Sequence, residues 1–266
     1  MAERRAAEIA ALFDRNAATY DRVNTVICFG LDGRWRRWAA GWALAAAPGA
    51  AGANVGAAAR TPAGAVIPPR PPRVLDACGG SGLVALELAR RGAQVTVADV
   101  SGGMLALAGR RAEREGLILE IVQADLATEP ATELPGAPFD AVTLAFGLRY
   151  VEDPAGLLRG LAAALVPGGS LVLLEAVVAR GGARARLAGR YFFDVAPRLG
   201  CLLAGRGELY AELTETVRAL GTAGDLLRIA EAAGLAPRER RLFAGGVVAG
   251  VVARRASGMF SSPVRT

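Results

Sequence analysis

The chain has 266 residues, and its 53% hydrophobic and 21% charged content is that of a globular protein rather than a disordered one. Its length suffices for one large domain with an appended cap. Basic residues outnumber acidic ones by 31 to 25, but all are arginines and most are scattered, which argues against a nucleic-acid partner. Because the chain has no histidine, it excludes a histidine general base, a Ser-His-Asp triad and a histidine-ligated metal.

The cysteines Cys28, Cys78 and Cys201 are odd in number and far apart in the sequence. This pattern predicts a protein of the reducing cytoplasm, without disulfides or a zinc site. Arg4 and Arg5 are not followed by an apolar core, so no signal peptide is expected. The sequence therefore predicts a cytoplasmic protein with no bound metal.

The first 72 residues divide into two predicted parts. Residues 1–45 are expected to be helical and to form a lid. Within them, Arg34-Trp35-Arg36-Arg37-Trp38 is a dense basic cluster, which indicates either the solvated face of an amphipathic helix or a contact with an anionic membrane. Residues 46–72 are rich in Ala, Gly and Pro and are predicted to be a flexible insertion.

Residues 73–254 begin as an alternation of short apolar runs and amphipathic segments, which predicts an α/β domain. The predicted strands span about residues 73–77, 94–98, 117–122, 139–145 and 170–175. The predicted helices span 82–91, 102–115 and 154–165, the last ended by Pro167-Gly168-Gly169. Such alternation gives a Rossmann-like, mostly parallel sheet with helices on both faces and ligands at the carboxyl ends of the strands.

The alternation is interrupted after the fifth strand. Residues 181–220 are predicted to be largely helical, with aromatics at 191–193, and to cover the substrate as a cap. Helix 223–233 restores the alternation, and the runs 236–243 and 246–253 predict a closing antiparallel hairpin. The hairpin would complete a seven-stranded sheet, and residues 255–266 are expected to be a frayed tail.

The glycine-rich segment Val74-Leu75-Asp76-Ala77-Cys78-Gly79-Gly80-Ser81-Gly82 joins the first predicted strand to a helix. A dinucleotide-binding loop needs a third glycine, for which Ala85 is a substitute. A carboxylate at Asp76, however, would repel a pyrophosphate and suits a ligand with an ammonium or sulfonium group. The pattern resembles the S-adenosylmethionine (SAM) site of Rossmann-like methyltransferases.

Three acids, Asp76, Asp99 and Asp125, each follow one of three successive predicted strands. Asp76, Gly80, Ser81 and Gly82 are expected to form the SAM loop, Asp99 to hold the ribose, and Asp125 to accept from the adenine amino group. The alternative for each acid is a structural one, since carboxylates at strand ends often cap the next helix.

The opening Phe13-Asp14-Arg15-Asn16-Ala17-Ala18-Thr19-Tyr20-Asp21-Arg22-Val23-Asn24 resembles that of the menaquinone/ubiquinone C-methyltransferase family, the UbiE/MenG type. Ala145-Phe146-Gly147-Leu148-Arg149, Leu165-Val166-Pro167-Gly168-Gly169 and Gly245-Gly246-Val247-Val248-Ala249 extend the resemblance over nearly the whole chain. The resemblance implies SAM-dependent methylation of a ring carbon on a polyprenylated quinol. The residues that it implies for the cofactor site, with their neighbours, are Tyr20 on a closing helix, Ser81, Asp99, Val100, Asp125, Leu126 and Ala145.

Methylation of a quinol carbon requires that an adjacent ring hydroxyl lose its proton. Without histidine, the proton must pass to a carboxylate, a tyrosinate or water. The candidate acceptors are Asp153, Asp194, Tyr150 and Tyr210, and Arg149 is a candidate to stabilise the phenolate. Structural alternatives are an i, i+4 pair of Arg149 with Asp153 and tyrosines that only form pocket walls.

Three functions remain open at this stage: a quinol C-methyltransferase, a methyltransferase for a phenolic or polyketide metabolite, and a SAM-binding protein without methyl transfer. The second is favoured by Tyr150, where the family usually has Asn, and by Tyr210-Ala211-Glu212 in place of Tyr-Arg-Tyr. A small-molecule substrate and no nucleic acid are expected, with the oligomeric state open. A quinone tail implies peripheral contact with the inner face of the membrane, through the Trp/Arg helix or residues 190–204.

Overall fold

The computed structural model describes residues 2–45, 59–60, 66–67, 70–204 and 208–255. Most of the predicted insertion 46–72 lies outside these residues, and the described part includes a short antiparallel pair of β1 (Ala59–Arg60) with β2 (Val66–Ile67). The predicted tail also lies outside them, apart from Arg255, which ends the last strand.

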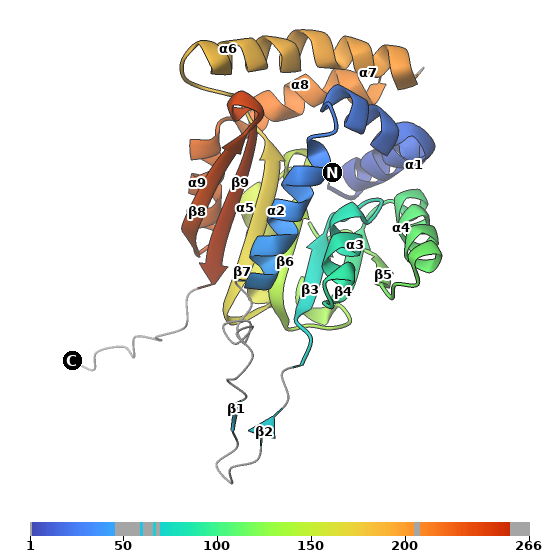
Figure 1. Cartoon of the computed structure of the whole chain (residues 1–266), viewed down its shortest axis with the longest axis vertical. Helices are drawn as coiled ribbons and strands as arrows, with labels where there is room; N and C mark the ends of the chain where they lie inside the picture. Colours follow the sequence, from blue (N-terminus) through green and yellow to red (C-terminus); the bar gives the residue numbers. More distant parts are fainter. Residues whose placement is uncertain (1, 46–58, 61–65, 68–69, 205–207, 256–266) are drawn as a thin grey trace, which may run out of the picture.

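A seven-stranded sheet forms the centre of the molecule, in the order β5-β4-β3-β6-β7-β9-β8 (Figure 1). Its strands are β3 (Arg73–Ala77), β4 (Gln94–Asp99), β5 (Glu120–Gln123), β6 (Phe139–Ala145), β7 (Leu165–Ala176), β8 (Leu235–Phe243) and β9 (Val248–Arg255). The first five pair in parallel, whereas β9 lies antiparallel to both β7 and β8. The predicted Rossmann-like sheet with a closing antiparallel hairpin is confirmed.

Successive residues of each inner strand pack into two different apolar layers, because side chains alternate between the faces of a sheet. On one face, Val74 and Val172 pack against α2 (Asp32–Ala45), α3 (Leu83–Arg90) and α4 (Gly102–Glu115). On the other face, Leu75 and Leu171 pack against α5 (Pro154–Ala163) and α9 (Ala223–Ala232). Both faces of the sheet are therefore buried.

The segment Pro167-Gly168-Gly169 does not end a helix as the sequence predicted. Helix α5 ends at Ala163, and β7 begins at Leu165 and runs through the glycines. The pairing of β6 with β7 shifts register here, and Gly168 has a φ of 76°. The glycines thus belong to an irregularity inside a long strand, which periodicity alone does not distinguish from a helix end.

The third predicted strand is also shorter than expected at its start. Helix α4 ends at Glu115 and is capped by Gly116, which has a φ of 65°. The Leu117 amide donates a hydrogen bond back to the Ala112 carbonyl. This helix cap occupies the first residues of the predicted strand 117–122, so β5 begins only at Glu120.

Helices at the carboxyl ends of the parallel strands form a separate layer (Figure 1). They are α1 (Ala2–Ile27), α6 (Ala183–Arg190), a π-helical turn (Tyr191–Val195), α7 (Ala196–Ala204) and α8 (Glu208–Leu220). Leu12, Val23 and Ile27 of α1 pack with Ala196 of α7 in a small apolar cluster. The N-terminal region therefore separates into α1, which belongs to this layer, and α2, which packs on the sheet.

Helix α1 is tied to α4 by two acidic side chains. The Asp14 carboxylate accepts hydrogen bonds from the Gly103 amide, at 2.9 Å, and from the Ser101 hydroxyl, both at the start of α4. Asp21 forms an ion pair with Arg111 at 2.7 Å between the two charged groups. These contacts hold α1 over the edge of the sheet where the glycine-rich loop lies.

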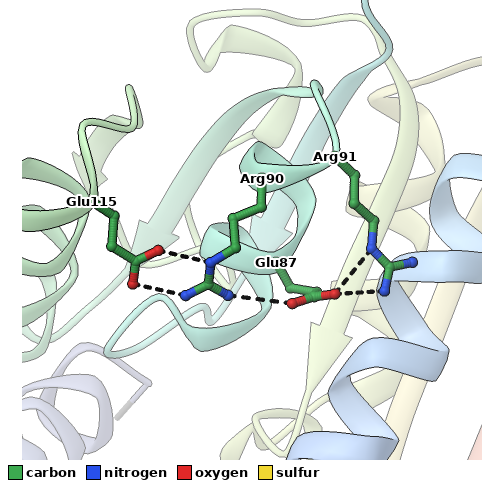
Figure 2. Close-up of polar contacts among 4 residues, drawn as sticks. All are labelled: Glu87, Arg90, Arg91 and Glu115. Carbon is green, nitrogen blue, oxygen red and sulfur yellow. Dashed lines mark hydrogen bonds and ion pairs between the residues drawn. The ribbon is translucent and has the colours of Figure 1, made fainter.

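Surface ion pairs connect α3 with α4, as Figure 2 shows. Arg90 donates to both oxygens of Glu115, each at 2.7 Å, and also contacts Glu87 at 3.3 Å. Glu87 in turn accepts from Arg91. Exposed pairs of this kind contribute little individually to stability, so the network fixes the spacing of the two helices more than it strengthens the fold.

The Trp/Arg cluster is divided between the two sides of α2, because Arg34 and Arg37 are exposed whereas Trp35 and Trp38 pack inside. Trp35 is 5% exposed, and the ring of Trp38 packs on Phe243 with centroids 5.4 Å apart. Arg36 pairs with the buried Asp32. Of the predicted alternatives, the solvated face of an amphipathic helix accounts for Arg34 and Arg37, and Trp35 is too buried to contact a membrane.

Replacing Gly250 by Ala tests the packing of α2 on the sheet. A methyl group at this position of β9 would overlap the six-membered ring of Trp38. We expect Gly250→Ala to lower the free energy of unfolding by about 1–3 kcal/mol, the usual cost of overpacking. Denaturant unfolding measures this loss.

Gly160→Ala is the matched control, since a methyl group at this position of α5 meets no atom within 4 Å. It should leave stability unchanged or raise it by up to about 1 kcal/mol through helix propensity. Equal stability of the Gly250 variant and wild type would contradict the packing described for α2.

Candidate active site

The glycine-rich loop between β3 and α3 is folded back onto the end of β4. A Cβ on Gly82 would lie 2.7 Å from the Cβ of Ala108, and the residue has a φ of 75°. Gly80, with a φ of 54°, donates its amide to Asp99 at 2.8 Å. Glycine is required at position 82 because its conformation and the close approach of α4 both exclude a side chain, and at position 80 the left-handed conformation favours glycine.

Asp76 lies almost fully buried beneath this loop. Its carboxylate accepts the Ala85 amide at 3.0 Å and the Thr143 hydroxyl at 2.7 Å. Burial raises the pKa of Asp76 from 3.8 to about 7, against the opposing effect of these hydrogen bonds. Asp76 therefore caps α3, as the structural alternative held, and also lines the cavity described next.

Asp99 and Asp125 lie at the ends of the neighbouring strands β4 and β5. Asp99 accepts the Gly80 and Ser101 amides with its two oxygens, at 2.8 and 2.9 Å, and its burial raises its pKa. Asp125 accepts the Ala127 amide at 3.0 Å and the Thr128 hydroxyl at 3.1 Å. Both carboxylates are thus fixed by local hydrogen bonds at one edge of the sheet.

A cavity of about 280 Å³ lies between α1 and the carboxyl ends of β3 to β6. It brings together nine of the ten residues expected for the cofactor: Tyr20, Asp76, Gly80, Ser81, Asp99, Val100, Asp125, Leu126 and Ala145. Gly82 is not among the lining residues, and its contribution is the close contact with α4 described above. We refer to this space as the polar cavity.

A second cavity, of about 460 Å³, lies beneath α6 and the π-helical turn. Most of its walls are apolar, from Ile27, Leu31, Trp35, Leu187, Tyr191, Phe192, Leu213, Val247 and Val248. Tyr20, Arg36 and Phe146 line both cavities, so the two spaces adjoin. We refer to the second space as the apolar cavity.

Arg149 is a buried cation at the wall of the apolar cavity. Its guanidinium donates to Glu175 at 2.6 Å, to the Phe146 carbonyl at 2.7 Å and to the Tyr150 hydroxyl at 3.2 Å. Burial opposes its charge, but Tyr150 and Glu175 outweigh this effect and raise the pKa of Arg149. Its Nε is buried without a hydrogen-bond partner among the described residues.

The structure separates the two aspartate candidates from Arg149. Asp153 caps α5 by accepting the Gly156 amide, and its ion pair is with Arg159 at 3.4 Å, so the alternative pairing with Arg149 is wrong. Asp153 lines only the polar cavity, and Asp194 is exposed and lines neither.

The two tyrosine candidates differ in what the structure describes. Tyr150 lines the polar cavity and packs edge-on against Phe13 at 5.2 Å between ring centroids. The side chain of Tyr210, on α8, lies outside the described residues. Burial raises the pKa of a third tyrosine, Tyr20, well above its usual value, so its hydroxyl stays protonated at neutral pH.

Glu175 and Arg36 are site residues that sequence reasoning did not identify. Glu175 follows the apolar run of the fifth predicted strand, the same signal that identified Asp99. Arg36 was assigned to the Trp/Arg cluster, where nothing in the local pattern indicates that it reaches a cavity.

The sheet order, the glycine-rich loop and the ribose-type acid at Asp99 define a SAM-dependent methyltransferase. The fold is shared with a SAM-dependent methyltransferase from Aquifex aeolicus, at a TM-score of 0.51 and 19% identity, over 70% of this chain and 84% of that one. A putative methyltransferase from Bacillus halodurans C-125 gives the same TM-score at 18% identity, over 70% and 93% of the two chains.

The chain belongs to the ubiE/COQ5 methyltransferase family, whose model matches residues 1–255. It is 36% identical over 236 residues to a demethylmenaquinone methyltransferase of Thermus thermophilus, covering 88% of this chain and 96% of that protein. The enzyme of the same name from Mycobacterium sp. strain KMS is 36% identical over 244 residues, which is 91% of each chain.

Asp76→Asn tests the burial of this carboxyl group. Because the folded-state pKa of about 7 exceeds the ordinary 3.8, the folded protein favours the protonated acid. The contribution of Asp76 to stability is therefore present below about pH 4 and is lost as the pH rises to 7, at up to about 1.4 kcal/mol per pH unit. The asparagine amide keeps the partners Ala85 and Thr143 and does not titrate.

We expect the variant to gain stability relative to wild type between pH 5 and pH 8, measured by denaturant unfolding at both values. Asp99, whose pKa is raised in the same direction, remains in both proteins and serves as an internal control. Parallel pH profiles for the two proteins would contradict the burial of an ionisable Asp76.

Proposed function

We propose that this enzyme transfers a methyl group from SAM to a ring carbon of a polyprenylated quinol, of the demethylmenaquinol to menaquinol type. The observation that carries the proposal is an apolar cavity that adjoins the cofactor site and holds a buried, charged Arg149. The names of the relatives support the same substrate class.

The residues that line the polar cavity match the polar groups of SAM. Asp99 is positioned for the two ribose hydroxyls and Asp125 for the adenine amino group, while Gly80 and Ser81 line the space without obstructing side chains. The cavity wall is rich in carboxylates, which suits a ligand with sulfonium and ammonium groups. When bound, SAM supplies a methyl group that is already activated by its sulfonium charge.

The remaining task of the protein is to align the substrate and to make its ring carbon nucleophilic. The ring hydroxyl gives its proton to water, and Arg149 favours the ionised oxygen by placing a guanidinium at a cavity with apolar walls, where charge interactions are stronger than in water. After the methyl group has moved to the ring carbon, that carbon loses its hydrogen as a proton to water and the ring hydroxyl is restored. Glu175 keeps the guanidinium in one orientation through the 2.6 Å contact.

A methyltransferase for a phenolic or polyketide metabolite is the second candidate. It is favoured by Tyr150, whose hydroxyl lies 3.2 Å from Arg149 in place of the asparagine that the family resemblance leads one to expect. The same cation would stabilise any phenolate, so the substrate rather than the chemistry distinguishes the two functions.

A turnover assay distinguishes them. The protein is incubated with methyl-labelled SAM and a short-tailed demethylmenaquinol, beside a panel of phenolic polyketides, and the product is located by mass spectrometry. We expect label on the quinol ring carbon. Label on a phenolic metabolite alone would replace the quinol with the second candidate.

Arg149→Lys in the same assay tests the role of the cation. Lysine keeps a charge beside Glu175 but loses the forked geometry, so we expect the fold to persist and kcat to fall about 10²- to 10³-fold at saturating SAM. The SAM dissociation constant should not change, because Arg149 lines the apolar cavity only. Arg159→Lys is the control, because the Arg159 side chain is exposed on α5, and equal kcat values for both variants would contradict the assignment.

Peripheral contact with the inner face of the membrane is part of the same proposal, now through α6 and α7. Leu187 is 72% and Leu202 is 78% exposed, and Arg184, Arg186 and Arg190 are exposed on α6 beside them. Leu187 also lines the apolar cavity, so a bilayer at this surface would deliver a prenyl tail to it. Among the described helices none is long and apolar enough to cross a bilayer.

Vesicle flotation tests this surface. We expect the protein to float with anionic vesicles and less with zwitterionic ones, and Leu187→Ser with Leu202→Ser to reduce flotation. Ile118→Ser is the control, because Ile118 is 89% exposed on the link between α4 and β5. Equal flotation of all variants would exclude α6 and α7 as the contact.

A further inference from the structure

Arg36 lies where the two cavities meet and has no role in the function described so far. Its side chain is 14% exposed and lines both the polar and the apolar cavity. Nη1 donates to Asp32 at 2.5 Å, and Asp32 is itself held by the Thr25 hydroxyl at 3.2 Å. Within the described part of the chain, no other hydrogen bond of Arg36 is present, so two further nitrogens can bind a ligand.

The charge balance of the polar cavity makes this arginine unusual. Six acids line the cavity: Asp21, Asp76, Asp99, Asp125, Glu152 and Asp153. Among the described lining residues, only Arg5 and Arg36 are cations. Arg5 lies within 4 Å of Glu8 and Glu212, whereas Arg36 extends between the cavities. A carboxylate entering this acidic space requires a cation, and Arg36 is the one at the junction.

The amino-acid part of SAM carries such a carboxylate. Arg36 also lines the apolar cavity, whose walls include Phe146, Ala176 and Val248 at β6, β7 and β9, so Arg36 lies on the side of the polar cavity away from β5. Asp125 lies at the end of β5, two strands away from β3. An adenine at Asp125 and a ribose at Asp99 would therefore direct the amino-acid end of the cofactor towards Asp76 and Arg36.

We propose that Arg36 binds the carboxylate of the amino-acid part of SAM, with Asp32 and Thr25 orienting its guanidinium. The ammonium group of the same ligand then faces Asp76, so the zwitterion meets a cation and an anion in matching order. The inference rests on the use of SAM and not on the identity of the methyl acceptor.

The test compares two ligands by calorimetry. S-adenosylhomocysteine contains the amino-acid part, and 5′-methylthioadenosine lacks it. We expect Arg36→Gln to raise the dissociation constant of S-adenosylhomocysteine by about 10- to 100-fold, the effect of one charge-assisted contact. The dissociation constant of 5′-methylthioadenosine should stay the same.

Arg37→Gln is the matched control, because Arg37 is the next residue of α2 and is exposed. It should change neither dissociation constant. Arg36→Lys keeps a charge beside the buried Asp32 and should recover part of the affinity for S-adenosylhomocysteine, which keeps the test usable if the glutamine variant does not fold.

Two results would overturn the proposal. Equal weakening of both ligands would mean that Arg36 supports the loop or α2 rather than the carboxylate. Unchanged binding of S-adenosylhomocysteine, with a raised KM for the methyl acceptor, would mean that Arg36 serves the apolar cavity instead.

Discussion

The attachment of α1 to α4 is the contact on which the site depends. Asp14 lies at the N-terminus of α4, where unpaired amides and the helix dipole favour a carboxylate, and it accepts the Gly103 amide there. About two turns further along α1, Asp21 forms an ion pair with Arg111. Because α1 is held there, it covers this edge of the sheet. The space between α1 and the sheet forms two adjoining cavities.

The two cavities divide the chemistry by polarity. The polar cavity has carboxylates fixed by backbone amides, an environment for a cationic nucleotide ligand. Arg149, one of the cations that line the apolar cavity, forms a buried ion pair with Glu175. Buried ion pairs are often no more stable than apolar replacements, so the presence of this one beside an apolar space is better explained by chemistry than by stability. Tyr20, Arg36 and Phe146 line both environments, and the proposed methyl transfer would take place beside them.

The sequence was most informative where the evidence is local. The strand, glycine turn and helix at residues 73–90 lie within one segment, so their pattern predicted both the loop and the acid at Asp99. The closing hairpin was likewise a local signal. Asp76 shows the limit of such reasoning, because the same residue caps a helix and lines the cavity, and the sequence offered these as alternatives.

Contacts between distant segments could not be predicted in this way. Arg149 and Glu175 are 26 positions apart in the sequence, and Asp14 and Gly103 are 89 positions apart. No periodic pattern in the sequence connects residues at such separations. Pro167-Gly168-Gly169 was interpreted as a helix end because its place in β7 depends on pairing with β6. The burial of Trp35 and the packing of Trp38 on Gly250 likewise depend on the sheet, which lies far from α2 in the sequence.

The central claim is that methyl transfer takes place at the junction of the two cavities. A crystal structure with S-adenosylhomocysteine and a short-tailed demethylmenaquinol tests it most directly. We predict that the sulfur lies beside Tyr20 and Phe146, with the quinol ring in the apolar cavity and one ring oxygen within hydrogen-bond distance of Arg149. A ring bound outside the apolar cavity, or a sulfur directed away from the junction, would contradict the account.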